Sequence, residues 1–244
     1  MIMYLSGLLS LKNVDELDLS EVNVLQAFPY MKKNSHEYIS RCKNFLMDSG
    51  AFTMMNSKSA KKKFNIRDYV KKYGSYVKEH DVENFIELDI DGVYGTDVYI
   101  DTLHELQDIT GKNPIKVFHT WRGLDYYKEL TKKEKIICIG GLVVGQIKQS
   151  DYEAFTSLIN IAHENGCKVH GLGVTDSVLL RRYNFDSVDS SRFTGTQRYG
   201  EFYKFDGHSI LALRAKGEFT FKGDECDRWS LNNWFDYSKY LEQY

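Results

Sequence analysis

Two stretches far apart in the sequence each end an apolar run in an aspartate. Asp48 ends the first, while Asp186 and Asp189 lie in the second. A carboxylate at the tip of a buried strand is costly unless it is paired or used in chemistry. Two such carboxylates converging on one pocket would suit the acid and nucleophile roles at a glycosidic bond. Gly140-Gly141 lies between them in the chain and could supply a floor of bare backbone.

Further polar side chains fall where other apolar runs end, namely Asp89, His119 and His170. Each strand-end aspartate could instead be a helix N-cap, and His170 could be a packed core histidine. Because the carboxyl ends of parallel strands meet at one edge of a sheet, we expect these groups to converge. Repulsion among the carboxylates must then be offset by a metal, by polar groups of a ligand or by shared protons.

The histidines and cysteines do not form the patterns of a metal site. His119, His170 and the aspartates could resemble an amidohydrolase-like cluster, but the seven histidines contain no His-x-His or His-x-x-x-His pair. None of the four cysteines lies in a Cys-x-Cys or Cys-x-x-Cys pair. Gly140-Gly141 also lacks the glycine spacing of a dinucleotide site. We therefore expect neither a metal nor a cofactor.

Short apolar runs alternate with amphipathic stretches along most of the chain. Most runs are continuously apolar, as expected for parallel strands buried on both faces. They predict eight strands, at Tyr4–Leu8, Val22–Phe28, Phe45–Ser49, Phe85–Ile90, Ile115–His119, Ile136–Gly141, Lys168–Gly173 and Phe185–Asp189. Helices are predicted over 65–80, 96–109, 150–165 and 230–241. This alternation predicts an α/β fold, a (β/α)8 barrel of TIM type, with an open doubly wound sheet as the alternative.

The length and composition fit one soluble domain. The 244 residues predict a single domain over 1–244, with the barrel over about 1–195 and an aromatic-rich C-terminal extension over about 196–244. We find no signal-peptide pattern and no apolar run of ~18 residues, which favours a reducing cytoplasm and no membrane partner. The net charge is −2. Lysine runs such as 61–63 and 132–133 could be solvated helix faces or a phosphate-binding face.

Five sequence blocks occur in an order that is typical of one enzyme family. The blocks are Asp48-Ser49-Gly50-Ala51-Phe52, Glu87-Leu88-Asp89-Ile90, Ile139-Gly140-Gly141-Leu142-Val143-Val144-Gly145, His170-Gly171-Leu172-Gly173-Val174 and Phe185-Asp186-Ser187-Val188 followed by Arg192. Together they resemble the tRNA-guanine transglycosylases, the queuine and archaeosine tRNA-ribosyltransferases with their relatives that act on DNA. Because the chain is short and lacks the family's zinc motif, it is most similar to the compact, zinc-less, phage-type branch that acts on DNA.

The resemblance implies a pentosyltransferase that exchanges guanine in DNA for a 7-deazaguanine base through a covalent aspartyl–sugar intermediate. The implied partners are DNA and a free base of the 7-deazaguanine type, with a helper protein or a homodimer as further candidates. A phage-encoded enzyme of this branch would work in the host cytoplasm. Three alternatives stay open: the same exchange on tRNA, a hydrolase that releases the base, and a non-catalytic subunit that binds nucleic acid.

The resemblance also assigns roles to individual residues. It implies that Asp186 is the nucleophile and Asp48 the general acid and base. It implies base binding by Asp89, Gly140, Gly141, Leu142, His170 and Phe52, and phosphate binding or support by Arg192, Asp189 and His119. Asp189 is the rival nucleophile, because side chains three residues apart on a strand point to opposite faces and only one should enter the site. The Phe-Asp-Ser-Val match favours Asp186.

Overall fold

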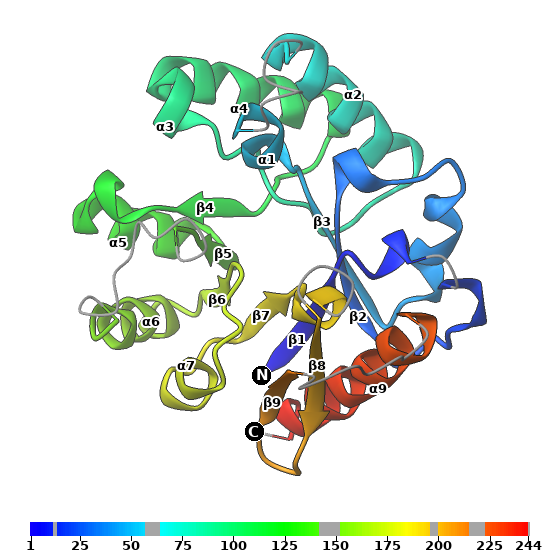
Figure 1. The fold of residues 1–244 in the computed structure, drawn as a ribbon. Coiled ribbons are helices and arrows are strands. Elements are labelled where there is room, and N and C mark those ends of the chain that lie inside the picture. Colours follow the sequence, from blue (N-terminus) through cyan, green and yellow to red (C-terminus); the bar gives the residue numbers. More distant parts are fainter. Residues whose placement is uncertain (12–13, 57–63, 142–151, 196–199, 215–222, 244) are drawn as a thin grey trace. The chain divides into compact units, whose positions relative to one another are not determined.

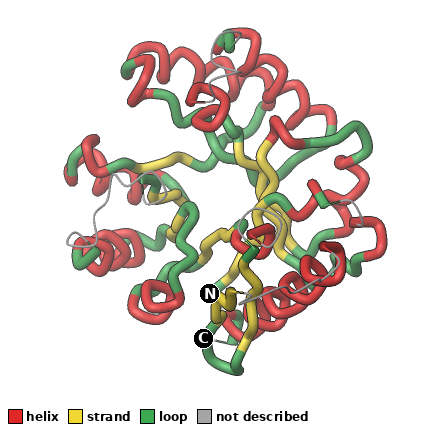
Figure 2. Tube along the Cα trace, in the orientation of Figure 1, coloured by secondary structure: helices red, strands yellow, loops and turns green. Residues whose placement is uncertain are grey.

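The computed structural model describes residues 1–11, 14–56, 64–141, 152–195, 200–214 and 223–243 (Figure 1). Strands and helices alternate along most of this length, which confirms the predicted α/β class (Figure 2). The strands are β1 (Ile2–Ser6), β2 (Asn23–Ala27), β3 (Asn44–Asp48), β4 (Lys116–Phe118), β5 (Ile136–Ile139), β6 (Lys168–Gly171), β7 (Ser187–Ser190), β8 (Glu201–Phe205) and β9 (Ile210–Arg214). The α-helices are α1 (Ala51–Asn56), α2 (Ile66–Glu79), α3 (Asp91–Tyr94), α4 (Thr96–Thr110), α5 (Leu124–Lys133), α6 (Ala154–Glu164), α7 (Ser177–Arg182) and α9 (Gly223–Leu241).

The chain divides into two compact units. Unit 1 comprises residues 1–5, 119–135 and 139–244, and unit 2 comprises residues 6–118 and 136–138. Each unit has its own set of parallel strand contacts.

In unit 2, β2 and β3 pair in parallel, with Asn23 opposite Asn44 and Ala27 opposite Asp48. Next in order comes the segment 85–90, which is bridged to β3 at Phe85 and to Ile115 at Ile86. The strand interiors are apolar on both faces, as the continuous apolar runs predicted, because Val24, Leu25, Leu46 and Met47 are all buried.

The predicted strand at Phe85–Ile90 is wrong in its length, because only two isolated bridges form there. The ladder stops at Glu87, whose backbone N–H still donates to the Ile115 carbonyl. The next donor on the neighbouring strand, the Val117 N–H, bonds to the Glu87 carboxylate at 2.8 Å. A side-chain oxygen therefore occupies the position of a strand carbonyl. The sequence gives no sign of this substitution.

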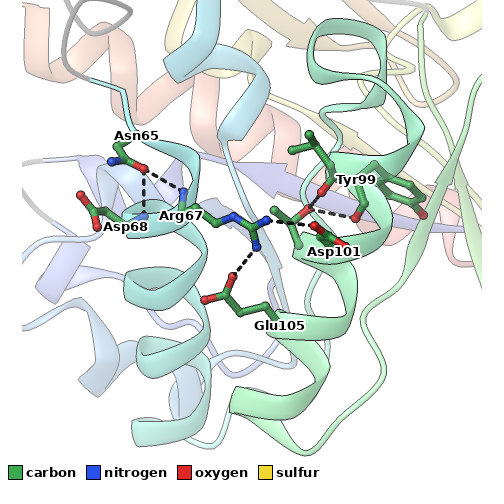
Figure 3. A network of polar contacts seen from close by, with 8 residues as sticks. Asn65, Arg67, Asp68, Tyr99, Asp101 and Glu105 are labelled. Atoms are coloured by element: carbon green, nitrogen blue, oxygen red, sulfur yellow. Dashed lines mark hydrogen bonds and ion pairs between the residues drawn. The ribbon is translucent and has the colours of Figure 1, made fainter.

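Two helices of unit 2, α2 and α4, lie side by side and are joined by a polar network (Figure 3). The Asn65 side chain caps α2 by accepting from the backbone N–H groups of Arg67 and Asp68. Arg67 then reaches across to Asp101 at 2.9 Å and Glu105 at 3.3 Å on α4. The helices approach closely because Gly74 has no side chain: a Cβ there would lie 3.0 Å from the Ile109 side chain.

In unit 1, β7 lies between β1 and β6, and both pairs are parallel. One face of these strands packs against α6, where the Phe155 ring meets the rings of Tyr183 and Phe185 edge to face at 5.5 Å. The helix α5 is tied to α6 by the Tyr127 hydroxyl, which donates to the Leu158 carbonyl at 2.9 Å. The predicted helix at 150–165 is confirmed over Ala154–Glu164, and residue 150 lies outside the described residues.

The C-terminal part of unit 1 is an antiparallel hairpin, β8 and β9, which packs on α9. The helix α9 confirms the predicted segment 230–241 but begins earlier, and the hairpin was not predicted. Aromatic side chains of both elements pack on one another: Tyr203, Phe205, Trp234, Tyr237 and Tyr240. Tyr203, Trp234 and Tyr237 are buried, so these aromatics form a small core.

The capping interaction of Asn65 gives a prediction about unit 2. The substitution Asn65→Ala removes the acceptor for two backbone donors and should lower the free energy of unfolding by about 1 kcal/mol. Urea denaturation followed by circular dichroism measures this change. The matched control is Asn113→Ala, which removes an exposed amide whose partner among the described residues is the Gln107 side chain. We expect the control to change stability by less than about 0.5 kcal/mol; equal losses in the two variants would contradict the capping role.

Candidate active site

Three adjacent strands of unit 1 carry polar side chains on one face. The register pairs His170 with Ser187 and Tyr4 with Asp189. Because successive strand residues point to opposite faces, Ser187 and Asp189 share a face with both partners. We call Tyr4, His170, Ser187 and Asp189 the polar strand face. The opposite face holds Met3, Leu5, Val169 and Val188, all fully buried.

His170 is the centre of the polar strand face and is completely buried. Its Nδ1 lies 2.8 Å from the Ser187 hydroxyl, and the Tyr4 ring meets the imidazole edge to face at 5.8 Å. In the described part of the chain no hydrogen-bond partner is found for Nε2, which lies 3.5 Å from the Asp189 carboxylate. A buried ring nitrogen without a hydrogen bond lowers the stability of the fold. Such groups are concentrated at functional sites.

Asp189 lies near the carboxyl end of β7 and is 8% exposed. Its Oδ1 accepts a hydrogen bond of 2.6 Å from the backbone N–H of Gly173, in the turn after β6. This turn requires a glycine, because residue 173 has a φ of 68°, in the left-handed region that side chains disfavour. A backbone donor thus fixes one oxygen of the carboxylate beside the imidazole.

The Gly140-Gly141 pair follows β5 and lies next to the same turn. The Ile139 carbonyl accepts from the Leu172 N–H at 3.1 Å, so the strand end and the turn after β6 run side by side. Gly140 is buried and Gly141 has a φ of 96°. Leu142, the third residue expected to bind a base here, lies outside the described residues.

Asp186 lies at the amino end of β7, not at a carboxyl end as the sequence suggested. Its Oδ2 accepts from the Val169 N–H at 2.8 Å and contacts the His163 Nε2 on α6 at 2.8 Å. Its backbone also bonds to Val169 and Ile2, at the start of the neighbouring strands. In parallel α/β sheets the amino edge serves stability, whereas active sites occupy the carboxyl edge. The expected role of Asp186 as nucleophile stays a prediction, and Asp189 is the acid near the carboxyl end of the same strand.

Arg192 follows β7 and therefore lies at the opposite end of that strand from Asp186, so it does not position that carboxylate. It begins a short 3-10 helix, Arg192–Thr194, and its backbone N–H donates to the Ser190 hydroxyl at 3.2 Å. Its charge also acts on Tyr203, whose pKa is raised to about 12, chiefly by burial and by its hydrogen bond with Glu201, while Arg192 opposes the shift. Arg192 remains an exposed cation close to the carboxyl edge.

Unit 2 holds the other predicted carboxylates. Asp48 ends β3 and is half-buried near two tyrosines of α2. Burial, and then the negative charge of Asp48, raise the pKa of both Tyr69 and Tyr73. Phe52 follows on α1 and is 38% exposed. Asp89 is half-buried, just beyond the point where the segment 85–90 leaves the ladder.

Because Asp48 belongs to unit 2 and Asp186 and Asp189 to unit 1, the expectation that two of these carboxylates face each other across a pocket stays a prediction. Within unit 2, Glu87 is more deeply buried than Asp48 and Asp89, with 1% of its surface exposed. It accepts from the Tyr99 hydroxyl at 2.7 Å as well as from Val117, and these bonds give it a structural role.

Sequence reasoning missed Tyr4, Ser187 and Gly173 as members of the site. The alternation of polar and apolar residues in Ser187-Val188-Asp189 was a signal for a strand with one polar face. His119 was predicted as a supporting residue; it is 5% exposed and stacks on Trp121, with ring centroids 4.0 Å apart.

Comparison with known proteins does not bear on the family of this chain. No family model matches the sequence, and no curated protein matches it. Within the described ranges no group of three or more His, Cys, Asp or Glu side chains is arranged to hold a metal ion. Among those same ranges, no helix combines the length and apolar character needed to cross a membrane.

The cysteines give a prediction about reactivity. Burial raises the pKa of the Cys42 thiol to about 12, and the thiol donates to the Tyr38 carbonyl. Since only the thiolate reacts, iodoacetamide at pH 8 should label Cys42 about a thousandfold more slowly than a free cysteine. Labelling should accelerate as the pH rises towards the folded pKa, and should become normal in urea. Peptide mass spectrometry measures the rate, and rapid labelling in the folded protein would contradict the burial of this thiol.

Proposed function

We propose that this protein exchanges guanine in DNA for a 7-deazaguanine base, through a covalent intermediate between an aspartate and the deoxyribose. The observation that carries the proposal is the Asp189 carboxylate at the carboxyl end of β7, oriented by the Gly173 N–H and adjacent to the buried His170. The ordered sequence blocks that resemble guanine transglycosylases supply the reaction class.

In this proposal Asp189 is the nucleophile, in place of Asp186. One carboxylate oxygen attacks C1′ of the deoxyribose, while the bond to guanine breaks and the departing base takes a proton from a general acid. The incoming base then attacks C1′, releases its proton to the same group and displaces the carboxylate. Two displacements at one carbon retain the configuration, so the new base occupies the position of the old one.

His170 acts in this proposal as a positioning residue, because it is fully buried and its ring meets Tyr4 and Ser187 within the sheet. Its unpartnered Nε2 beside Asp189 would hold the carboxylate in a single orientation, through a hydrogen bond formed when the site tightens around the substrate. This role replaces the expected role of covering the face of the base.

The remaining roles follow the sequence expectation. Asp48 is the proposed general acid and base, and Asp89 is the proposed acceptor for the N–H edge of guanine. The backbone at Gly140, Gly141 and Leu142 is proposed to read a carbonyl edge. Phe52, which is exposed just after β3, would lie against the base.

These roles require unit 1 and unit 2 to form one (β/α)8 barrel. The strand order supports this part of the proposal. Numbering the predicted strands from one to eight, unit 2 has the order second, third, fourth and fifth (β2, β3, the segment 85–90 and β4). Unit 1 has the order first, eighth and seventh (β1, β7 and β6). The backbone of β6 and the residue after it bond to the sixth strand, because Lys168 donates to Lys135, just before β5, and Leu172 donates to Ile139, the last residue of β5. Joined end to end, the two orders give the cyclic order of a barrel.

The proposed reaction predicts incorporation of a labelled base into a polymer. Purified protein incubated with radiolabelled guanine should transfer label to DNA, and an excess of a 7-deazaguanine base should compete with it. Label in tRNA alone would instead favour the tRNA alternative. Release of guanine from DNA without incorporation would favour a hydrolase, and no label in either polymer would contradict catalysis and leave a binding subunit.

Two isosteric variants separate the candidate nucleophiles. Asp189→Asn keeps an oxygen for the Gly173 N–H but is a poor nucleophile, so exchange should fall by about a thousandfold or more. Asp186→Asn alters only contacts at the amino edge, and we expect exchange within about threefold of the unsubstituted protein, with a lower midpoint of unfolding. Initial rates of label incorporation measure both effects. The reverse result, with Asp186→Asn inactive but folded and Asp189→Asn active, would refute the assignment.

A further inference from the structure

Trp121 is a large aromatic residue left half in water. It lies in the short 3-10 helix Thr120–Arg122, just after β4, and is 49% exposed. Its ring is nearly parallel to that of buried His119, with centroids 4.0 Å apart and 11° between the planes. Because one face of the indole covers His119, much of the exposed surface belongs to the opposite face and the edges. A tryptophan held flat and exposed in this way is typical of a binding surface.

A second aromatic side chain and a cation lie a few residues further on. The Arg122 guanidinium lies 5.5 Å from the centroid of the Tyr126 ring, and Tyr126 is 38% exposed. The helix α5 is anchored to α6 through Tyr127, whose hydroxyl donates to the Leu158 carbonyl. Its buried side chains are Tyr127, Leu130 and Thr131.

The charge of this segment suits a polyanion. Arg122 lies between the two exposed aromatic residues in the sequence, and α5 carries Lys128, Lys132 and Lys133 on its exposed surface. The helix also carries two acids, Asp125 and Glu129, the second of which is paired with Lys132, so its three lysines exceed its acids by one. Flat rings with interspersed cations favour stacked bases joined by phosphates over an apolar protein partner.

We propose that Trp121, Arg122 and Tyr126, here called the aromatic platform, bind unpaired bases of single-stranded DNA. The inference deepens the proposed function, on which the choice of DNA rests. A target guanine must leave the base stack before its glycosidic bond can be reached, so the strand around it must be open. The platform would hold bases next to the target by stacking, while Arg122 contacts a phosphate.

Tryptophan fluorescence tests this platform directly, because the chain has three tryptophans of different exposure. Trp121 is 49% exposed, Trp229 on α9 is 42% exposed, and Trp234 is fully buried. A single-stranded oligothymidylate, added without any free base, should quench the fluorescence of the unsubstituted protein and of Trp229→Phe. It should leave Trp121→Phe unquenched. Equal quenching of Trp121→Phe would overturn the proposal.

Affinity measurements complete the test. Trp121→Ala should weaken binding of the oligonucleotide by about tenfold, whereas the matched control Trp229→Ala should bind as the unsubstituted protein does. Arg122→Gln should weaken binding and reduce its salt dependence by about one phosphate contact. A duplex of the same length should bind more weakly than the single strand. Unchanged affinity in Trp121→Ala, or equal affinity for the duplex, would overturn the proposal; emission from buried Trp234 reports that each variant is folded.

The outcomes distinguish this inference from the proposed function. Binding is measured without an incoming base and does not need catalysis. Loss of binding in Trp121→Ala with no base exchange by the unsubstituted protein would refute the proposed function and support the platform. Normal exchange with unchanged affinity in Trp121→Ala would refute the platform alone.

Discussion

The hydrogen bond from the Gly173 N–H to the Asp189 carboxylate is the interaction on which the proposed active site depends. It fixes an acid near the carboxyl end of β7, in a position that water reaches only slightly. A carboxylate there must be compensated, and the backbone donor and the adjacent His170 provide polar contacts that the apolar neighbours do not. The left-handed turn at Gly173 therefore serves both the loop and the orientation of the Asp189 carboxylate.

The parallel register of β1, β7 and β6 explains why these polar groups are together. Parallel pairing places Tyr4, Asp189, Ser187 and His170 on one face, while the alternate residues are fully buried on the other face. The same register separates Asp186 from Asp189, because one precedes the strand and the other lies near its end. Asp186 then joins β6 to α6 through Val169 and His163, which is a role in stability at the amino edge.

Much of the fold could be predicted from apolar periodicity. Seven of the eight predicted strand segments contain a strand, and the helices at 65–80, 96–109 and 230–241 are present. The segment 85–90 could not be predicted correctly, because the Glu87 side chain takes a ladder hydrogen bond that no pattern reveals. In the site, Asp189 and His170 were found by residue type. Choosing between Asp186 and Asp189 required the contacts of the two side chains, because Asp186 bonds to the Val169 N–H and His163 while Asp189 bonds to the Gly173 N–H.

The location of the covalent intermediate tests the central claim most directly. Denaturing the protein with DNA during turnover, without an incoming base, should trap the sugar on the protein, and nuclease and protease digestion would leave a modified peptide. Asp186 and Asp189 lie in one tryptic peptide, Tyr183–Arg192, so fragment ions must assign the site. The account predicts fragment ions that place the sugar on Asp189. A sugar on Asp186 or Asp48, or no adduct while base exchange proceeds, would contradict it.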